Sequence, residues 1–143
     1  MTRIVRATFG TPAFEACHAI RLDVFVGEQN VPLDEELDAL DATAIHVLAL
    51  IDDTPVGTAR AVEKTPGTWK IGRVAVRAAY RGQGIGAALM QGIESACPAR
   101  HFMLSAQTHA LSFYEKRGYS AEGPEFIEAG IAHRLMRKDA AIL

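Results

Sequence analysis

The chain of 143 residues is long enough for one domain with a sizeable core, because a chain of this length buries roughly two-thirds of its unfolded surface. Hydrophobic residues make up 49% of the sequence and the formal net charge is −2, values that argue against disorder and against broad electrostatic binding of nucleic acid. No apolar run approaches the ~20 residues of a membrane span, and the first residues lack the apolar core of a signal peptide, so we expect a compact protein outside the membrane.

The first half of the chain predicts a strand, a helix and a hairpin. An apolar stretch over residues 4–8 is typical of a strand, and Thr11 followed by Pro12 is a helix start, with a capping side chain and a proline at the first helical position. We expect that helix to run to about Val26. The next two strands are expected over residues 43–51 and 56–63, joined by a turn over residues 52–55.

The second half alternates between strands and helices, without repeats or an obvious linker. The pattern predicts one mixed α/β sheet in a single domain over residues 1–143. The expected elements are a strand over residues 69–76, a helix over 84–97, a strand over 101–106, a helix over 110–117, and strands over 119–122 and 131–137.

The glycine-rich segment over residues 81–86, Arg-Gly-Gln-Gly-Ile-Gly, is the most informative motif of the chain. It follows a strand-like run and opens an amphipathic helix. Glycines at alternate positions remove the Cβ atoms that would keep a ligand away from the backbone, so successive N–H groups can converge on one anion at a helix N-terminus. The segment therefore predicts a phosphate-binding turn.

Three kinds of nucleotide site compete for this turn. A P-loop is excluded because the sequence has no G-x-x-x-x-G-K-[S/T] string. The segment over residues 82–87 satisfies G-x-G-x-x-A, but a dinucleotide site also needs a carboxylate roughly 20 residues further on, and the strand over 101–106 is followed by Gln107 and Thr108. A dinucleotide oxidoreductase is thus a distant alternative, which leaves a site for the pyrophosphate of an acyl-coenzyme A.

Two motifs resemble the GNAT superfamily of N-acetyltransferases. Residues 81–86 are similar to its R/Q-x-x-G-x-G/A signature, and residues 110–119 to its helix ending in F-Y-x-x-x-G-[F/Y]. Residues 21–46 and 126–133 further resemble the ElaA/YjcF-like bacterial branch of this superfamily. The resemblance covers nearly the whole chain and implies the GNAT acyl-CoA N-acyltransferase fold, a central mixed, mostly antiparallel sheet flanked by helices.

The resemblance also implies an activity. We expect acetyl-CoA as cosubstrate, no metal, and direct transfer of the acetyl group to a primary amine of a small molecule or peptide within a ternary complex. Nucleic-acid and membrane partners are not expected, and a homodimer is compatible with the sequence. The alternative from another class is a noncatalytic domain that binds or senses acyl-CoA.

Most of the expected site residues follow from the same resemblance. Tyr114 matches the family tyrosine that protonates the departing thiolate, with aromatic packing beside Phe113 as its other interpretation. In the family, the strand before the glycine turn separates from its neighbour, and the backbone N–H near Val76 would polarise the thioester carbonyl. The residues expected to bind the cofactor are Val74, Ala75, Val76, Arg81, Gly82, Gln83, Gly84, Ile85 and Gly86.

The general base stays open among Glu28, His46, His133 and Glu128. Each histidine lies among apolar strand residues, where a hydrogen-bonded core histidine is the commoner case, although histidine also suits a base near neutral pH. Arg21 falls on the apolar arc of the first helix, and Glu28 would fall there if the helix continued, so both form structural ion pairs or line the acceptor cleft. The expected acceptor-binding residues are Arg21, Glu28 and Glu128.

The acidic cluster and the remaining histidines and cysteines are two further candidate sites. The acidic residues Asp34, Glu35, Glu36, Asp38 and Asp41 predict a solvated loop with capping roles, or a means of attracting a cationic amine. The remaining histidines lack metal-ligand spacing, and the two cysteines, Cys17 and Cys97, are far apart. Two cysteines are too few for a disulfide framework, so free thiols and a cytoplasmic location are expected.

Overall fold

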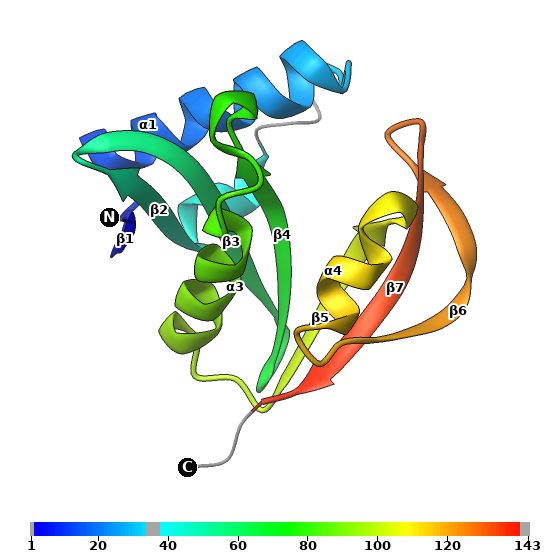
Figure 1. Ribbon diagram of the computed structural model, residues 1–143. Helices are drawn as coiled ribbons and strands as arrows, with labels where there is room; N and C mark the ends of the chain where they lie inside the picture. The colour runs from blue at the N-terminus through cyan, green and yellow to red at the C-terminus, as the bar shows by residue number, and fades with distance from the viewer. Residues whose placement is uncertain (1, 34–37, 141–143) are drawn as a thin grey trace.

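The computed structural model describes residues 2–33 and 38–140, which form a seven-stranded sheet with helices on both faces (Figure 1). The strand order is β1-β2-β3-β4-β5-β7-β6, and every neighbouring pair is antiparallel except β4 and β5. The expected mixed, mostly antiparallel sheet is therefore confirmed. No helix in these two described ranges is long and apolar enough to cross a bilayer.

The elements follow the predicted order along the chain. The strands are β1 Thr2–Arg6, β2 Ile45–Ile51, β3 Thr54–Thr65, β4 Thr68–Val76, β5 His101–Gln107, β6 Ser120–Glu128 and β7 Ile131–Asp139. The α-helices are α1 Pro12–Arg21, α3 Ile85–Ala96 and α4 Leu111–Glu115. A π-helix, η1 Leu22–Glu28, continues α1, and short 3₁₀-helices cover Ala39–Ala42 (η2), Ala78–Tyr80 (η3) and Thr108–Ala110 (η4).

Most element boundaries lie within two residues of the sequence prediction, and two of the differences have a physical explanation. The first helical segment runs past Val26 to Glu28, because its last turns widen into a π-helix. β6 continues past Glu122 to Glu128 although Gly123 and Pro124 signal its end. The pairing with β7 is irregular between Glu122 and Phe126, and β6 is an edge strand, which is where a sheet tolerates proline. The predicted start of the first helix is confirmed, since Thr11 Oγ1 accepts the N–H of Phe14.

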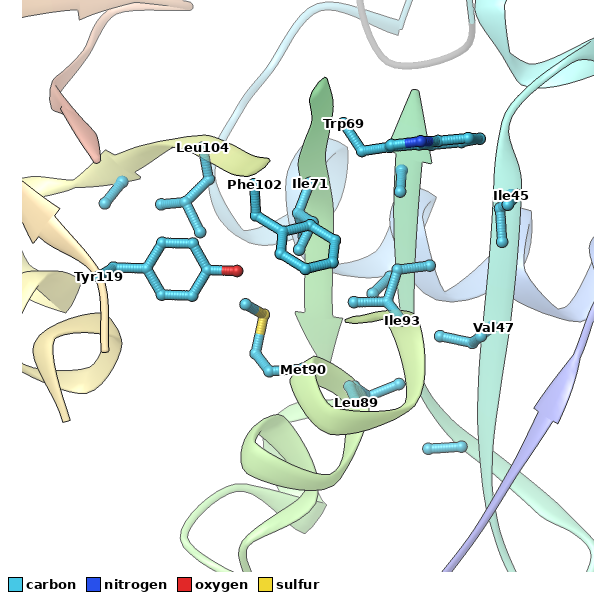
Figure 2. Close-up of a cluster of buried hydrophobic side chains, with 14 of the residues drawn as sticks. Ile45, Val47, Trp69, Ile71, Leu89, Met90, Ile93, Phe102, Leu104 and Tyr119 are labelled. Atoms are coloured by element: carbon cyan, nitrogen blue, oxygen red, sulfur yellow. The ribbon is translucent and has the colours of Figure 1, made fainter. Parts of the chain in front are cut away.

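The sheet buries apolar side chains on both faces. On one face, Leu89 and Ile93 of α3 are fully buried against alternate residues of β2, β3 and β4, and Figure 2 shows this cluster continuing across β5 to Tyr119. On the other face, Cys17 and Ile20 of α1 pack with Leu48. The alternation of strand residues between two cores fixes which face each cleft residue belongs to.

Candidate active site

β4 and β5 pair over only part of their length. Their parallel register runs from Thr68↔His101 to Ile71↔Leu104, and the two strands then diverge (Figure 1). A bulge on β4 accompanies the separation, because the register advances from Gly72 to Ala75 on β4 while β3 advances only from Arg60 to Thr58. Arg73 in the bulge has φ of 52°. Bulges bend a strand and increase its twist, which carries the end of β4 away from β5.

The divergence leaves backbone groups of β4 facing an open gap. The backbone N–H of Arg77 donates to the carbonyl of Val56 on β3 at 2.8 Å, so the backbone of Arg77 faces β3. Because successive residues of a strand turn their N–H and C=O groups to opposite sides, the backbone groups of Val76 face the gap. In agreement, the carbonyl of Val76 accepts a hydrogen bond from Arg81 Nε at 2.9 Å. The N–H of Val76 therefore faces the gap, and its role as a donor to the thioester stays a prediction.

A cleft with a volume of about 590 Å³ fills the space around this gap. That volume lies within the range typical of small-molecule sites, ~300–1,000 Å³. The residues that line it come mainly from η1, β3, β4, β5, α4 and the β6–β7 hairpin, and include Gln29, Val74, Gln107, Tyr114, Glu128 and His133. Three of the sequence-predicted site residues outside β4, Tyr114, Glu128 and His133, are therefore brought to one cavity.

Tyr114 and His133 reach the cleft from opposite faces of the sheet. Tyr114 packs with the α3-side core and contacts Phe113 and Tyr119, with ring centroids 5.0 and 6.2 Å away. His133 lies opposite Gln107 in the β5–β7 register, and cross-strand partners share a face. Ala106, the neighbour of Gln107, belongs to the α3-side core, so Gln107 and His133 face the α1 side.

His133 is held in one tautomer with a nitrogen facing Glu128. Its Nδ1–H donates to the carbonyl of Ile131 at 2.7 Å, which leaves the Nε2 lone pair of the neutral ring available. Nε2 lies 3.9 Å from Glu128 Oε2, and Phe126 stacks on the ring with centroids 5.8 Å apart. A tight turn between β6 and β7, with Ala129 and Gly130 both at positive φ, brings Glu128 and His133 together.

Tyr114 is a protonated phenol over the whole working range of pH. Burial raises its pKa to about 12, although the charge of Arg117 acts in the opposite direction. Arg117 stacks 3.9 Å above the ring of Phe113 and donates to the carbonyl of Phe113 at 2.7 Å. These contacts hold the turn of α4 that carries Tyr114, and the protonated phenol has a proton to donate.

The glycine turn fits a phosphate group through its backbone. Gly82 and Gly84 both have φ of 80°, and a Cβ at either would meet no protein atom within 4 Å, so glycine is required there by conformation. At Gly86 a Cβ would instead approach Phe113 Cζ to 3.1 Å. α3 begins at Ile85, and the first N–H groups of a helix have no partner within it. This cradle, open on its outer side, suits the pyrophosphate of a coenzyme A.

Two of the expected site residues are structural, and these expectations are wrong. Arg21 is fully buried and donates two hydrogen bonds to Asp41, at 2.8 and 3.0 Å, so it forms the structural pair rather than an acceptor contact. His46 has an exposed fraction of 1%, its Nε2–H donates to the carbonyl of Asp41 at 2.9 Å, and burial lowers its pKa. A side chain sealed in this way cannot take a proton from a substrate.

The acidic segment is only partly solvated. Asp38 caps η2 as expected, since its carboxylate accepts the N–H of Leu40 at 3.1 Å. The prediction of a solvated loop is wrong for Asp41, which is 1% exposed and also accepts from Arg60 at 3.1 Å. A buried charge needs partners, and the two arginines supply them. Asp34, Glu35 and Glu36 lie outside the described residues.

Glu28 lies at the glycine turn and not along the cleft. Its carboxylate is 2.8 Å from Arg81, and its role as a base or acceptor contact stays a prediction. The next residue, Gln29, lines the cleft and accepts from Gln107 Nε2 at 2.9 Å. Neither glutamine could be recognised as a site residue from the sequence, because glutamine carries no signature of its own. The bulge at Arg73 was likewise not predicted, although an isolated glycine in a strand, Gly72, could have indicated it.

Neither cysteine has the features of a nucleophile. Cys17 is fully buried, and burial raises the pKa of its thiol. Burial likewise raises the pKa of Cys97, to about 11. The thiolate is the reactive form of cysteine, and both thiols stay protonated near neutral pH. Among the residues for which the structure gives positions, no three histidine, cysteine or acidic side chains gather into a group of metal-binding size.

Comparisons with known proteins agree with this geometry. Residues 17–140 match the profile of the acetyltransferase (GNAT) domain family. YjcF of Bacillus subtilis, which is named an N-acetyltransferase, is 40% identical over 124 residues, covering 84% of this chain and 88% of YjcF. The crystal structure of Escherichia coli ElaA superposes with a TM-score of 0.86 at 29% identity, covering 97% of this chain and all of ElaA (100%).

Two further solved structures share the fold. An acyl-CoA N-acyltransferase from Pseudomonas aeruginosa is 30% identical with a TM-score of 0.83, covering 96% of this chain and 99% of the other. A more distant GNAT family acetyltransferase from Elizabethkingia anophelis, with acetyl-CoA bound, has a TM-score of 0.72 at 17% identity, covering 96% and 97% of the two chains. The second likeness shows the fold alone.

Proposed function

The chain belongs to the GNAT family of acetyltransferases and is a transferase enzyme, and we propose that it transfers the acetyl group of acetyl-CoA directly to a primary amine held in the cleft. One observation carries the proposal: Tyr114 and the His133–Glu128 pair enter the same cleft from opposite faces of the sheet, beside the unpaired end of β4. A proton donor and a proton acceptor therefore lie on opposite sides of the gap in which the acetyl group would pass from sulfur to nitrogen.

The cofactor side of the cleft lies on the α3 face. The glycine turn and the first N–H groups of α3 would hold the pyrophosphate, and the open edge of β4 near Val76 would hold the pantetheine arm. When bound, acetyl-CoA supplies an activated thioester. The N–H of Val76 would donate to the thioester oxygen, because a preorganised donor stabilises negative charge that develops there.

The acceptor side lies on the α1 face. A primary amine is protonated near neutral pH and must lose a proton before its nitrogen can form the new C–N bond. His133 Nε2, with its lone pair free, would accept that proton, and the Glu128 carboxylate at 3.9 Å would stabilise the resulting imidazolium. The fixed Nδ1–H bond to Ile131 orients the ring for this step.

The leaving group needs a proton of its own. As the C–S bond breaks, Tyr114 would donate its phenolic proton to the departing sulfur, so that no free thiolate is left in the cleft. Across the cycle, the ammonium nitrogen loses one proton to His133 before it attacks and a second as the tetrahedral intermediate collapses, while Tyr114 delivers one proton to sulfur. The second proton from nitrogen restores the Tyr114 phenol through solvent and His133 releases its proton to solvent, so one proton is released for each ammonium that is acetylated. Two raised cysteine pKa values favour this direct transfer over an acetylated enzyme.

The proposal is tested by incubating the protein with acetyl-CoA and a panel of amines and peptides. We expect free thiol to appear only when a suitable amine is present, with the N-acetylated amine identified by mass spectrometry. The alternative, a noncatalytic domain that binds acyl-CoA, predicts that acetyl-CoA raises the melting temperature without amine-dependent thiol release. An equal stabilisation by NAD would reject the coenzyme A site itself.

A further inference from the structure

The wall of the cleft formed by β3 and β4 carries a row of cations. Arg60 and Lys64 lie four residues apart on β3 and therefore share one face of the strand with Val62. Lys70 lies opposite Val62 in the β3–β4 register, so it lies on the same face. Their neighbours Ala61 and Ile71 belong to the α3-side core, so the cations face the α1 side, where His133 lies. Arg73, in the bulge, is the fourth cation along this wall, and all four line the cleft.

Two cations of the row, Arg60 and Arg73, form ion pairs, whereas Lys64 and Lys70 at the outer end of the cleft form none with the described residues. Asp38 lies 2.7 Å from Arg60 and 3.5 Å from Arg73, so these two charges are compensated. Lys70 is half-buried and Lys64 is exposed, and neither makes an ion pair or hydrogen bond with any residue that the structure describes. The glutamate beside Lys64, Glu63, accepts the N–H of Gly67. Over residues 2–33 and 38–140, the outer end of the cleft therefore has two cations without a carboxylate partner.

The opposite wall has the reverse character. Glu128 and His133 lie there, where the amine of the acceptor is expected. A partly buried ammonium loses hydration and gains most from an oxyanion of the ligand. We propose that the acceptor carries an anionic group, a carboxylate or a phosphate, in addition to its amine, and that Lys70 and Lys64 bind this group. This inference rests on the proposed acetyl transfer to an amine.

Strand geometry sets the length of such an acceptor. Lys70 pairs with Val62 and Val76 pairs with Gly57, so Lys70 and Val76 lie five β3 residues apart, about 16 Å at ~3.3 Å per residue. A lysine side chain spans part of that distance, and the ligand must span the rest. The amine and the anion are therefore several bonds apart, as in an ω-amino acid or a peptide with an acidic residue, and further apart than in an α-amino acid.

The experiment compares matched acceptors and matched variants. Aminohexanoate, aminohexanamide and an aminoalkyl phosphate of the same length are offered to the wild type, to Lys70→Gln and Lys64→Gln, and to Arg3→Gln as control. Arg3 is an exposed cation on the edge strand β1, away from the cleft. We expect an anionic acceptor to have at least a tenfold higher kcat/KM than the amide, roughly the value of one charged hydrogen bond. The preferred anion distinguishes carboxylate from phosphate.

The variants should act through KM. Lys70→Gln should remove most of the preference, Lys64→Gln less, and Arg3→Gln none, and added salt should reduce the preference of the wild type. Equal rates for aminohexanoate, its phosphate analogue and its amide would overturn the inference while the acetyl transfer stands. An equal loss in Arg3→Gln would also overturn it, because the effect would then be one of overall charge.

A binding measurement keeps the inference testable if no amine is acetylated and the proposed function fails. N-acetyl-aminohexanoate and its amide are titrated into CoA-saturated protein by calorimetry. The anionic ligand should bind at least several-fold more tightly in the wild type, and this difference should disappear in Lys70→Gln. Equal binding of the two ligands would overturn the inference independently of turnover.

Discussion

At the scale of single residues, the surroundings of Tyr114 and His133 suit the opposite tasks that we propose for them. Burial holds the phenol of Tyr114 in its protonated form, with a pKa of about 12. The backbone carbonyl of Ile131 engages Nδ1–H of His133 and leaves Nε2 as an acceptor. Neither role depends on an unusual residue type, so the chemistry comes from position.

Replacing Tyr114 with phenylalanine should separate catalysis from packing. Tyr114→Phe keeps the ring contacts with Phe113 and Tyr119, so CoA affinity and stability should change little while turnover falls about 100-fold to 10,000-fold. The defect should shrink with an acyl donor whose thiol has a lower pKa. Tyr119→Phe is the contrast, because the Tyr119 hydroxyl donates to Glu94 at 2.8 Å and its loss should lower the melting temperature but not kcat. The reverse pattern would make Tyr114 a packing residue.

His133→Gln should lower kcat by a similar factor of about 100 to 10,000 if Nε2 is the base. Glu128→Gln should cost less, about tenfold, since Glu128 acts through the imidazolium. His101→Gln is the matched control, because His101 is exposed and bonds to Asp139 at 2.8 Å, at the other end of β5 from the cleft. Initial rates over a range of amine concentrations measure these effects. Wild-type kcat in His133→Gln would move the base to another group.

Sequence reasoning could nominate His46 and His133 but could not distinguish them. Both lie among apolar residues in strands. The difference arises from sheet position. β2 lies beside β3 within the sheet and is covered by α1, whereas β7 borders the cleft next to the edge strand β6. Arg21 is a similar case: its place on the apolar arc was visible in the sequence, but its partner Asp41 lies twenty residues away along the chain.

At the scale of elements, local patterns predicted most strands and helices, and the deviations have long-range causes. The turn at Asp52 and Asp53 and the start at Thr11 depend on neighbouring residues alone, and both were predictable. The bulge at Arg73 depends on how β4 meets β3, which the residues around it do not fix by themselves. The gap that forms the cleft is therefore a property of paired strands.

Gly84→Val should weaken CoA binding far more than it weakens the fold. Gly84 and Gly10 have almost the same φ, 80° and 83°, and a Cβ at either meets no protein atom within 4 Å. Gly10→Val therefore carries the same backbone strain, about 1–2 kcal/mol, away from the glycine turn. We expect similar losses of melting temperature in both variants and a loss of CoA affinity, measured by calorimetry, in Gly84→Val only. Equal CoA affinity in the two folded variants would contradict a backbone cradle at this turn.

At the scale of the whole molecule, the buried Asp41 ties α1, η2 and β3 together, and we expect it to contribute to stability in acid. Burial opposes ionisation of Asp41, but its bonds to Arg21 and Arg60 outweigh burial and lower its pKa from 3.8 to about 2. Because the folded pKa lies below the unfolded one, this carboxylate stabilises the fold fully above pH ~4 and loses that effect as the pH falls toward 2.

Urea unfolding at pH 7 and pH 3 measures this contribution. The wild type should lose about 1 kcal/mol from Asp41 between pH 7 and pH 3, about half of the loss that is complete only below pH ~2, and Asp41→Asn should lack this part of the slope. Asp41→Asn should also be about 3–5 kcal/mol less stable at pH 7, since Arg21 stays buried without its partner. Asp53→Asn, an exposed carboxylate paired with Arg3, is the control. An acid slope in Asp41→Asn equal to that of the wild type would assign the acid sensitivity to other groups.

Strands β1–β4 and strands β5, β7 and β6 are joined through the short β4–β5 register. The groups proposed to react lie on both sides of this junction, so the cleft depends on the whole sheet. Direct transfer requires acetyl-CoA and the amine to be present in the cleft together. A route through an acetylated cysteine would instead need a reactive thiolate, and Cys17 and Cys97 both have raised pKa values.

The most direct test is the intact mass of the protein after incubation with acetyl-CoA and no amine, followed by addition of an amine identified in the acceptor screen. Direct transfer predicts an unmodified protein and no thiol release before the amine is added, then one N-acetylated amine for each thiol released. A protein that gains an acetyl group, releases thiol without amine, and passes that group to the amine would contradict the account.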